Sequence, residues 1–482
     1  MGCLRSGDYT VKEIRKEVVA AVLPVQEHWL PQSNLDLVLP LIDVGIFFCY
    51  EKPKMPLHSI VATLKTSLAQ CLVSYYPFAG EVVQNSVGEP EVLCNNRGVE
   101  FVEAYGDVEL RELNLYNPDE SVEGKLVPKK RLGGALSVQV TELRCGGVVV
   151  SCMFDHRVAD AYSTNMFLVS WAEMTQAKPL TMRPSFRRSV ITPRRPAHYD
   201  PHMDNLYVPI SALPPPETNP SEHSLISRMY YITAESLVQL QSSASTDHES
   251  RRSKLESFSA FLWQMVAKSA SDKKTLERED CSNNKNKNNL LTKMGIVVDG
   301  RTRLINIEAT EAEANSMKSY FGNVLSIPYS EHNVETLSNQ PLPWVADQLH
   351  QCLKSSATKE HFMDLIDWVE AHRPEASLAK IYCAGSSDGP AIVVSSGQRF
   401  PIGKMDFGWG RPRIGSYHFP WGGDAGYVMP MPNPVGNGDW VVYMHLRKRQ
   451  LEVIEAEAGQ VFKPLTNVYL DSLAASTRPP TV

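Results

Sequence analysis

The sequence predicts a mixed α/β protein of two domains. At 482 residues the chain is longer than the size at which one hydrophobic core stops growing. Its composition, 43% hydrophobic and 21% charged, is that of an ordinary globular protein. Strand-like apolar runs and helical patterns occur on both sides of a proline-rich stretch at 189–224. We therefore expect an N-terminal domain at 1–188, a crossover at 189–224 without regular elements, and a C-terminal domain at 225–482.

In the first half, Tyr9–Val22 predicts an opening strand of mixed polarity. Leu37–Phe48 predicts a second strand, which is more apolar. Leucine and isoleucine recur at helical spacing over Ile60–Leu72, and Tyr76-Pro77 ends that helix because the residue before a proline avoids the helical conformation.

His156 stands where an apolar run gives way to an amphipathic segment. Val148–Phe154 predicts a buried strand, and apolar residues at helical spacing follow over Tyr162–Trp171. A histidine at the mouth of such a strand is held rigidly while it faces a cavity, and its ordinary pKa lets it accept a proton near neutral pH. Asp160 occupies the position of a helix N-cap. From the residues alone, Asp160 either orients the imidazole of His156 or shapes the loop.

The second half shows the same mixture of patterns. Met229–Ile232 predicts a strand, and Thr233 is expected to cap a helix that runs through Leu240. Further segments of a mixed α/β half are Val393–Ser396, Trp440–Leu446 and Leu451–Gln460. Cys281–Asn289 is rich in asparagine and lysine and predicts a surface loop.

Composition excludes several classes of function. The net charge of −6 argues against nucleic acid as a partner. The nine scattered cysteines favour a reducing compartment and argue against a metal site or a disulfide framework. No apolar run is long enough to span a bilayer, so we expect no membrane association. We also expect a cytoplasmic protein that acts as a monomer. The start of the chain matches the myristoylation pattern, with Gly2 as acceptor and Cys3 available for a second acyl chain, which is a minor alternative.

Several motifs, in one order along the chain, resemble the BAHD acyltransferases, a plant family that transfers acyl groups from coenzyme A. The motifs are His156 to Asp160, Asp299–Arg301, Tyr320–Asn323 and Asp406–Gly410, the last reading Asp-Phe-Gly-Trp-Gly. Ser74–Gly80 and Leu255–Trp263 extend the resemblance nearly end to end. Within the family, the chain is most similar to the branch of coniferyl alcohol acyltransferases. The resemblance implies two chloramphenicol-acetyltransferase-like domains with the active-site channel at their interface.

The resemblance also implies a role for individual residues. His156 is the catalytic base. Asp160 pairs with an arginine, for which Arg301 is our first candidate and Arg303 the second. Asp406 supports the site through structure, together with Gly408, Trp409 and Gly410. No permanent cofactor or metal is expected, and acyl-CoA is a co-substrate. The residues matching coenzyme A contacts are Ser253, Lys254, Ser257, Ser395, Ser396 and Arg399.

The chain departs from the family at two places. Many relatives carry a tryptophan where Gly397 stands, which helps to bind the oxyanion, so this role is expected to pass to Ser395 or water. Glu81 stands at a position where relatives commonly carry an arginine. Gly385–Gly389 satisfies the hydrolase pattern G-x-S-x-G, but Pro390 and a β-branched run follow it, so we interpret it as a loop before a strand.

The expected activity is transfer of an acetyl, benzoyl or hydroxycinnamoyl group to the hydroxyl of an aromatic or apolar acceptor. Family members that esterify shikimate or quinate use an arginine before the position of Ser395, and here no arginine lies between Arg373 and Arg399. Lys380 lacks the planar fork of arginine. Coniferyl alcohol is therefore our leading candidate. The alternatives are an amine acceptor, or a family member without catalytic activity that binds acyl-CoA or a protein partner.

Overall fold

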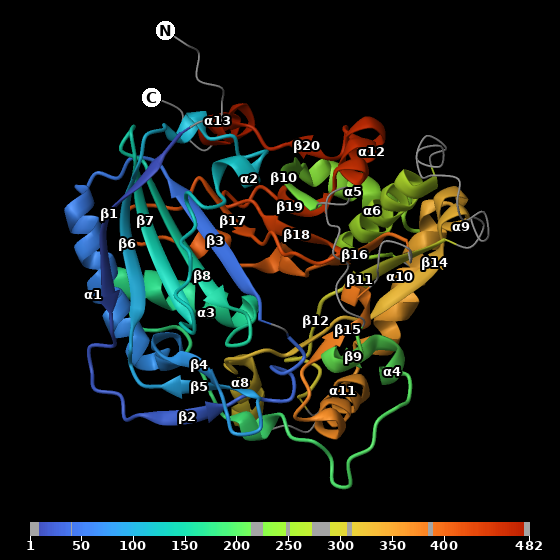
Figure 1. Cartoon of the computed structure of the whole chain (residues 1–482). Helices are drawn as coiled ribbons and strands as arrows, with labels where there is room; N and C mark the ends of the chain where they lie inside the picture. The colour runs from blue at the N-terminus through green and yellow to red at the C-terminus, as the bar shows by residue number, and fades with distance from the viewer. Residues whose placement is uncertain are drawn as a thin grey trace, which may run out of the picture.

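The structure is a computed structural model that describes residues 9–39, 41–213, 225–246, 251–271, 290–305, 311–383 and 389–476. Two large sheets organise it, each with helices packed against it (Figure 1). Strands and helices occur in both halves, which confirms the predicted mixed α/β class.

The first sheet has six strands in the order β1-β6-β7-β8-β3-β17. These strands are β1 (Val11–Val19), β6 (Val99–Gly106), β7 (Leu136–Leu143), β8 (Val148–Asp155), β3 (Asp43–Tyr50) and β17 (Ile414–His418). Helices α1 (Leu57–Ser74) and α3 (Ala161–Thr175) pack on each other and bury one hydrophobic core with this sheet. A small sheet of β2 (His28–Pro31), β5 (Pro90–Cys94) and β4 (Glu81–Gln84) lies beyond it.

The second sheet has seven strands in the order β14-β11-β16-β18-β19-β10-β20. Its strands are β14 (Tyr329–Asn333), β11 (Leu291–Ile296), β16 (Ala391–Val394), β18 (Gly426–Pro432), β19 (Trp440–Arg447), β10 (Leu225–Ile232) and β20 (Lys463–Pro464). Helices α5 (Ala234–Ser243), α6 (Lys254–Ser271), α9 (Val334–Asn339), α10 (Leu342–Ser356) and α12 (Lys448–Ala458) share a second core with it.

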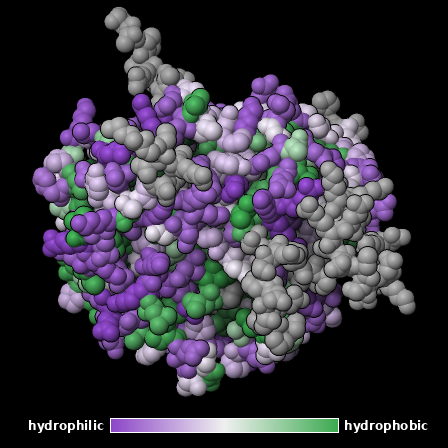
Figure 2. All heavy atoms as spheres, turned by 45° about the horizontal axis from the view of Figure 1, so that its top comes forward, coloured by the Kyte–Doolittle hydropathy of each residue, from purple (hydrophilic) through white to green (hydrophobic). Residues whose placement is uncertain are grey.

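A third core lies around α11 (Lys359–His372) and reaches the other face of β16. The remaining short elements include α2 (Pro118–Ser121), α4 (Met203–Leu206), β9 (Tyr207–Pro209), β12 (Val298–Asp299), α8 (Glu311–Lys318), β13 (Leu325–Ser326), β15 (Ser377–Ala379) and α13 (Asn467–Ser476). On the face drawn in Figure 2, hydrophilic residues dominate and apolar residues form only small groups.

One strand crosses the predicted division of the chain. β17 lies far beyond the crossover in the sequence, yet it pairs antiparallel with β3, so that Tyr417 faces Ile46. The boundaries at 1–188, 189–224 and 225–482 stay a prediction, but the first sheet takes its edge strand from the second half of the chain.

Most predicted elements are confirmed. The strands in Tyr9–Val22 and Val148–Phe154, the helix over Ile60–Leu72 and the helix capped by Thr233 all form, and the hydroxyl of Thr233 accepts a hydrogen bond from the backbone N–H of Ser236. β16 follows Pro390, as we expected from its β-branched residues.

Two expectations were wrong. The strand predicted at Leu37–Phe48 begins only at Asp43, because the carboxylate of Asp36 accepts hydrogen bonds from the backbone and hydroxyl of Ser33 and holds a turn there. The stretch 189–224 was expected to lack regular elements, but α4 forms one helical turn between its prolines and β9 pairs with β15.

Some expectations fall outside the described residues. They concern Gly2 and Cys3, the loop Cys281–Asn289, most of Gly385–Gly389 and the crossover after residue 213. Among the described residues, no helix is long and apolar enough to cross a membrane, and no cluster of side chains is suited to hold a metal ion. The seven described cysteines are all free.

Candidate active site

A channel of about 820 Å³ is lined by residues from both halves of the chain. His156, Tyr162 and Asn165 come from the β8–α3 region, whereas Ser395 and Tyr427 come from the second sheet. Most of the wall is apolar or aromatic, with a small number of polar groups. This composition is typical of a small-molecule site.

The backbone around His156 is fixed on both sides. β8 ends at Asp155, and the backbone N–H of His156 donates to the carbonyl of Ile42 at 2.9 Å. The buried carboxylate of Asp155 accepts from the backbone N–H of Arg157 at 3.0 Å and from its guanidinium at 3.0 and 2.7 Å. These contacts close a tight turn that presents the half-buried imidazole to the channel.

Asn323 determines which ring nitrogen of His156 carries the proton. Its side-chain N–H groups donate to the carboxylate of Asp36 at 3.0 Å and to the backbone carbonyl of His156 at 2.9 Å. The amide oxygen of Asn323 therefore faces Nδ1 of His156, 3.1 Å away. Because that oxygen can only accept, Nδ1 is the donor, and Nε2 of the neutral ring is the bare nitrogen that is open to a ligand.

Asp36 in turn fixes Asn323. It is fully buried, and one carboxylate oxygen accepts from the backbone N–H of Asn323 at 2.6 Å as well as from its side chain. The other oxygen accepts from Ser33 and lies 3.8 Å from Arg188. Burial alone would lower the pKa of Arg188, but the charge of Asp36 raises it above its ordinary value.

Asp160 pairs with Arg301, the partner that we chose from the family resemblance. The guanidinium donates to the two carboxylate oxygens at 2.8 and 3.1 Å. Asp160 also caps α3 by accepting from the backbone N–H of Ser163 at 2.8 Å. Among the described residues, no hydrogen bond joins Asp160 to His156. The structure thus places Asp160 in the loop-shaping arrangement, and not in a triad.

Arg301 joins α3 to the segment that carries Asn323. It donates to the backbone carbonyls of Tyr320 and Gly322, and its guanidinium lies 4.3 Å from the centre of the Tyr162 ring. Only 2% of its side chain is exposed. Burial alone would lower the pKa of Arg301, but the charges of Asp160 and Asp299 raise it above its ordinary value, so the guanidinium stays charged.

The carboxylate of Asp406 closes a tight turn over Asp406–Gly410. The carboxylate of Asp406 accepts from the backbone N–H groups of Gly408 at 2.8 Å and Gly410 at 2.9 Å. Both glycines have positive φ angles, +104° and +108°, which side chains disfavour. Trp409 packs edge-on against Tyr50. Asp406 is not among the described residues that line the channel.

The residues expected to contact coenzyme A divide into two groups. Ser253, Ser395, Ser396 and Arg399 line the channel, whereas Lys254 and Ser257 are not among its described lining residues. Ser253 and Glu256 exchange hydrogen bonds at the start of α6, as in a capping box, and the buried hydroxyl of Ser257 donates to the carbonyl of Ser253 at 2.9 Å. Ser253 and Ser257 therefore stabilise the start of α6.

Three channel cations are available for a negatively charged ligand. Arg303, Arg399 and Lys404 are exposed and line the channel, and none forms an ion pair with another residue of the described part. Sequence reasoning named Arg399 and held Arg303 in reserve for Asp160, but it missed Lys404. No local pattern marked this lysine.

Gly397 is packed too closely to be replaced by tryptophan. A Cβ atom built on it would lie 2.8 Å from the backbone oxygen of Pro430. The indole that the family resemblance led us to expect at this position therefore does not fit the present backbone. The hydroxyl groups next to Gly397 in the sequence and on the channel are those of Ser395 and Ser396. Tyr427 also lines the channel, and burial raises its pKa to about 12, which keeps that phenol protonated.

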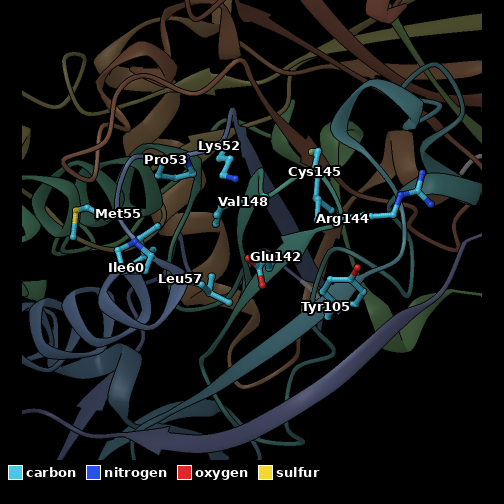
Figure 3. Close-up of a pocket in the computed structure, with 13 residues that line it drawn as sticks. Lys52, Pro53, Met55, Leu57, Ile60, Tyr105, Glu142, Arg144, Cys145 and Val148 are labelled. Atoms are coloured by element: carbon cyan, nitrogen blue, oxygen red, sulfur yellow. The ribbon is translucent and has the colours of Figure 1, made fainter.

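A second, smaller pocket of about 280 Å³ lies between the start of α1 and the β7–β8 turn (Figure 3). Lys52, Met55 and Leu57 form one side of it, and Arg144 and Cys145 the other. It shares no lining residue with the channel.

Comparison with known proteins shows the relationship of this chain. A family model described as "Transferase family" matches residues 9–461. The chain is similar to shikimate O-hydroxycinnamoyltransferase of Nicotiana tabacum, at 26% identity over 92% of this chain and 98% of the relative. It is also similar to anthranilate N-benzoyltransferase protein 3 of Dianthus caryophyllus, at 24% identity over 90% of this chain and 95% of the relative.

Solved structures share the fold. Vinorine synthase matches with a TM-score of 0.65 and 19% identity, covering 94% of this chain and 98% of that one. TRI101 of F. graminearum, complexed with coenzyme A and T-2 mycotoxin, matches with a TM-score of 0.68 and 14% identity, covering 90% of this chain and 98% of that one.

Proposed function

Because this chain belongs to the BAHD transferase family and is an acyl-CoA-dependent acyltransferase, we propose that His156 is its general base. This base takes the proton from the hydroxyl of an uncharged aromatic or apolar acceptor. The observation that carries the proposal is the hydrogen bond between Nδ1 of His156 and Asn323, which leaves Nε2 bare on the channel.

The reaction needs no enzyme nucleophile. Nε2 of His156 takes the proton of the acceptor hydroxyl while the oxygen attacks the thioester carbonyl of acyl-CoA. The carbon–sulfur bond of the tetrahedral intermediate then breaks, and the imidazolium returns its proton to the leaving thiolate. The products are the ester and free coenzyme A, so all atoms and charges balance.

The loop around His156 supports this step through its rigidity. Proton transfer requires that the base stay within hydrogen-bond reach of the acceptor hydroxyl. Asn323 holds the ring, while Asp160 and Arg301 hold the start of the helix that follows it. Asp160 and Asp406 are thus positioning residues, and neither contacts a reacting atom in this proposal.

We assign the binding of coenzyme A to the cationic side of the channel. Arg399 and Lys404 meet phosphate charge, Arg303 adds a third cation, and the hydroxyls of Ser395 and Ser396 bind the pantetheine arm. Lys254 follows the α6 cap and adds charge near it. Ser253 and Ser257 act at the helix end.

The apolar part of the channel wall favours a neutral aromatic acceptor. Ile42, Phe154, Tyr382, Phe419 and Trp421 belong to the wall of the channel. Lys380, the cation considered as a substitute for a carboxylate-binding arginine, is not among the described lining residues. A wall of apolar and aromatic side chains binds a phenylpropanoid alcohol such as coniferyl alcohol better than a carboxylate. An amine is the second candidate, because a relative is named as an N-benzoyltransferase.

A donor-by-acceptor matrix, read by mass spectrometry, tests the proposal. We expect ester formation with coniferyl alcohol or a similar aromatic alcohol, and little product with shikimate or quinate. Efficient esterification of shikimate or quinate would contradict the acceptor assignment. Acyl-CoA binding without turnover across the panel would instead favour a family member without catalytic activity.

We also propose that the protein acts as a cytoplasmic monomer. The free state of all seven described cysteines supports a reducing compartment.

A further inference from the structure

Asn165 holds an unsatisfied hydrogen-bond acceptor on the channel wall. Only 3% of this residue is exposed, and it lines the channel. Its side-chain N–H groups donate to the carbonyl of Ala161 at 2.8 Å and to the hydroxyl oxygen of Tyr417 at 3.0 Å. These two contacts fix the orientation of the amide, and its buried oxygen has no partner. A buried polar atom of this kind is costly unless a ligand satisfies it.

Tyr417 adds a donor beside this acceptor. Its hydroxyl lies 3.5 Å from the carbonyl of Ala161, which is too long for a strong hydrogen bond, so its proton is available to a ligand. Burial raises the pKa of Tyr417 well above its ordinary value, and the phenol stays protonated. Together the two side chains present one acceptor and one donor, which suits a ligand that carries both amide N–H and amide carbonyl groups.

Both groups lie on the side of the sheet from which His156 projects. Tyr417 on β17 pairs with Ile46, which pairs with Cys152 on β8. Side chains at alternate positions of a strand share a face, so the face of Tyr417 also carries Phe154 and leads to His156. Two strand spacings separate Tyr417 from β8, or about 10 Å.

From Asn165 the channel runs along α3 toward Arg399 and Lys404. Asn165, Val169 and Glu173 line it at successive turns, which covers about 12 Å of helix. The segment 399–406 runs beside the end of the helix, where Gln176 donates to the backbone of Asp406, and this segment brings Arg399 and Lys404 to the wall. A ligand whose phosphates bind these cations thus passes Asn165 on its way to His156.

We propose that Asn165 and Tyr417 bind the amide groups of the pantetheine arm of acyl-CoA. The amide oxygen of Asn165 accepts from the N–H of one amide of the arm, and Tyr417 donates to the carbonyl of the other. The pantetheine arm joins the phosphates to the thioester and contains secondary amides, so it matches the available donor and acceptor. This inference rests on the proposed function, and it makes Asn165 a positioning residue for the thioester.

The test measures the affinity of coenzyme A itself for the full-length protein by isothermal titration calorimetry. Asn165→Leu keeps the size of the side chain and removes the acceptor, and we expect the Kd to rise about tenfold or more. Tyr417→Phe should give a smaller rise. In both variants the KM for the acceptor, measured at saturating donor, should stay within about twofold.

Thr164→Val is the matched control. Thr164 is the neighbour of Asn165 on α3 and also has a buried side-chain oxygen without a partner, but it is not among the described lining residues of the channel. Its replacement should leave the Kd unchanged. If Asn165→Leu does not fold, Asn165→Ala removes the same acceptor with a smaller side chain.

Three results would overturn the inference. These are an unchanged Kd for coenzyme A in the folded Asn165 variant, a rise in the acceptor KM alone, and an equal loss of affinity in Thr164→Val. Failure of the wild-type protein to bind coenzyme A would contradict the proposed function as well, which distinguishes the two cases.

Discussion

The loop around His156 and the channel wall along α3 differ in how their polar groups are partnered. In the loop, Asp36, Asp160 and Arg301 are buried, and each is satisfied by other parts of the chain. On the wall, the amide oxygen of Asn165 has no partner and Arg399 has no counter-ion among the described residues. The polar groups around His156 are thus held in place by hydrogen bonds within the protein. The polar groups of the channel wall can instead form hydrogen bonds with a ligand.

Of the changes that test this difference, removal of the base should lower activity the most. For His156→Ala we expect kcat to fall by about a hundredfold to ten-thousandfold, because proton transfer loses its acceptor. The Kd for coenzyme A should stay unchanged, since the α3 wall is intact. Steady-state kinetics and calorimetry measure both quantities. His58→Ala, an exposed change on α1, is the control, and near wild-type turnover of His156→Ala would mean that the base lies elsewhere.

Breaking the buried ion pair should destabilise the loop and the fold together. Asp160→Asn leaves Arg301 buried with a weaker partner, and we expect a loss of about 3 kcal/mol in the free energy of unfolding, with lower activity. Asp299→Asn is the matched change, because Asp299 also pairs with Arg301 but is 35% exposed and should cost less. Thermal denaturation reports both variants. An inactive Asp160→Asn protein with unchanged melting would indicate a direct catalytic role.

Loosening the imidazole should affect turnover more than binding. Asn323→Ala removes the acceptor that holds Nδ1 of His156, and we expect kcat to fall by about tenfold to a hundredfold. Asp36→Asn keeps an acceptor for Asn323 and should cause a smaller loss. A larger effect on the Kd for coenzyme A than on kcat would show that Asn323 serves the wall and not the base.

A contact outside the site should have the smallest effect. Hydrogen bonds from Arg373 lower the pKa of Glu89 below its ordinary value. A lowered folded-state pKa gives stability that is present above the unfolded pKa of about 4.3 and is lost as the pH falls through the folded value. The Tm of wild type should therefore fall more steeply below about pH 4.3 than that of Glu89→Gln, by an effect of about 1 kcal/mol or less. Glu370→Gln, which alters a longer contact with Arg373, is the control, and parallel curves for wild type and Glu89→Gln would refute the assignment.

The elements that sequence patterns predicted are those whose signals are local. β8, α3 and its cap at Asp160 lie within one short segment, so hydrophobic period and cap chemistry were sufficient. The pairing of β17 with β3 joins residues such as Tyr417 and Ile46 that are far apart in the chain, and no local pattern indicates such a contact.

The same distinction applies to the site. His156 and Arg301 were found because they belong to recognisable motifs. Asn323 lay in a quoted motif, but its role depends on Asp36, which is 287 positions away in the sequence. Asn165 carries no sequence signal, since only the fold shows that its amide oxygen is buried without a partner.

The ring of His156 offers the most direct test of the central claim that Asn323 leaves Nε2 as the base. Nitrogen NMR of protein with ¹⁵N-labelled histidine, with His156→Gln to assign the signals, distinguishes the protonated from the bare ring nitrogen. At a pH where the ring is neutral, we expect Nδ1 of His156 to carry the proton and Nε2 to be bare, and this preference should weaken in Asn323→Ala. A wild-type ring protonated at Nε2 would contradict the account.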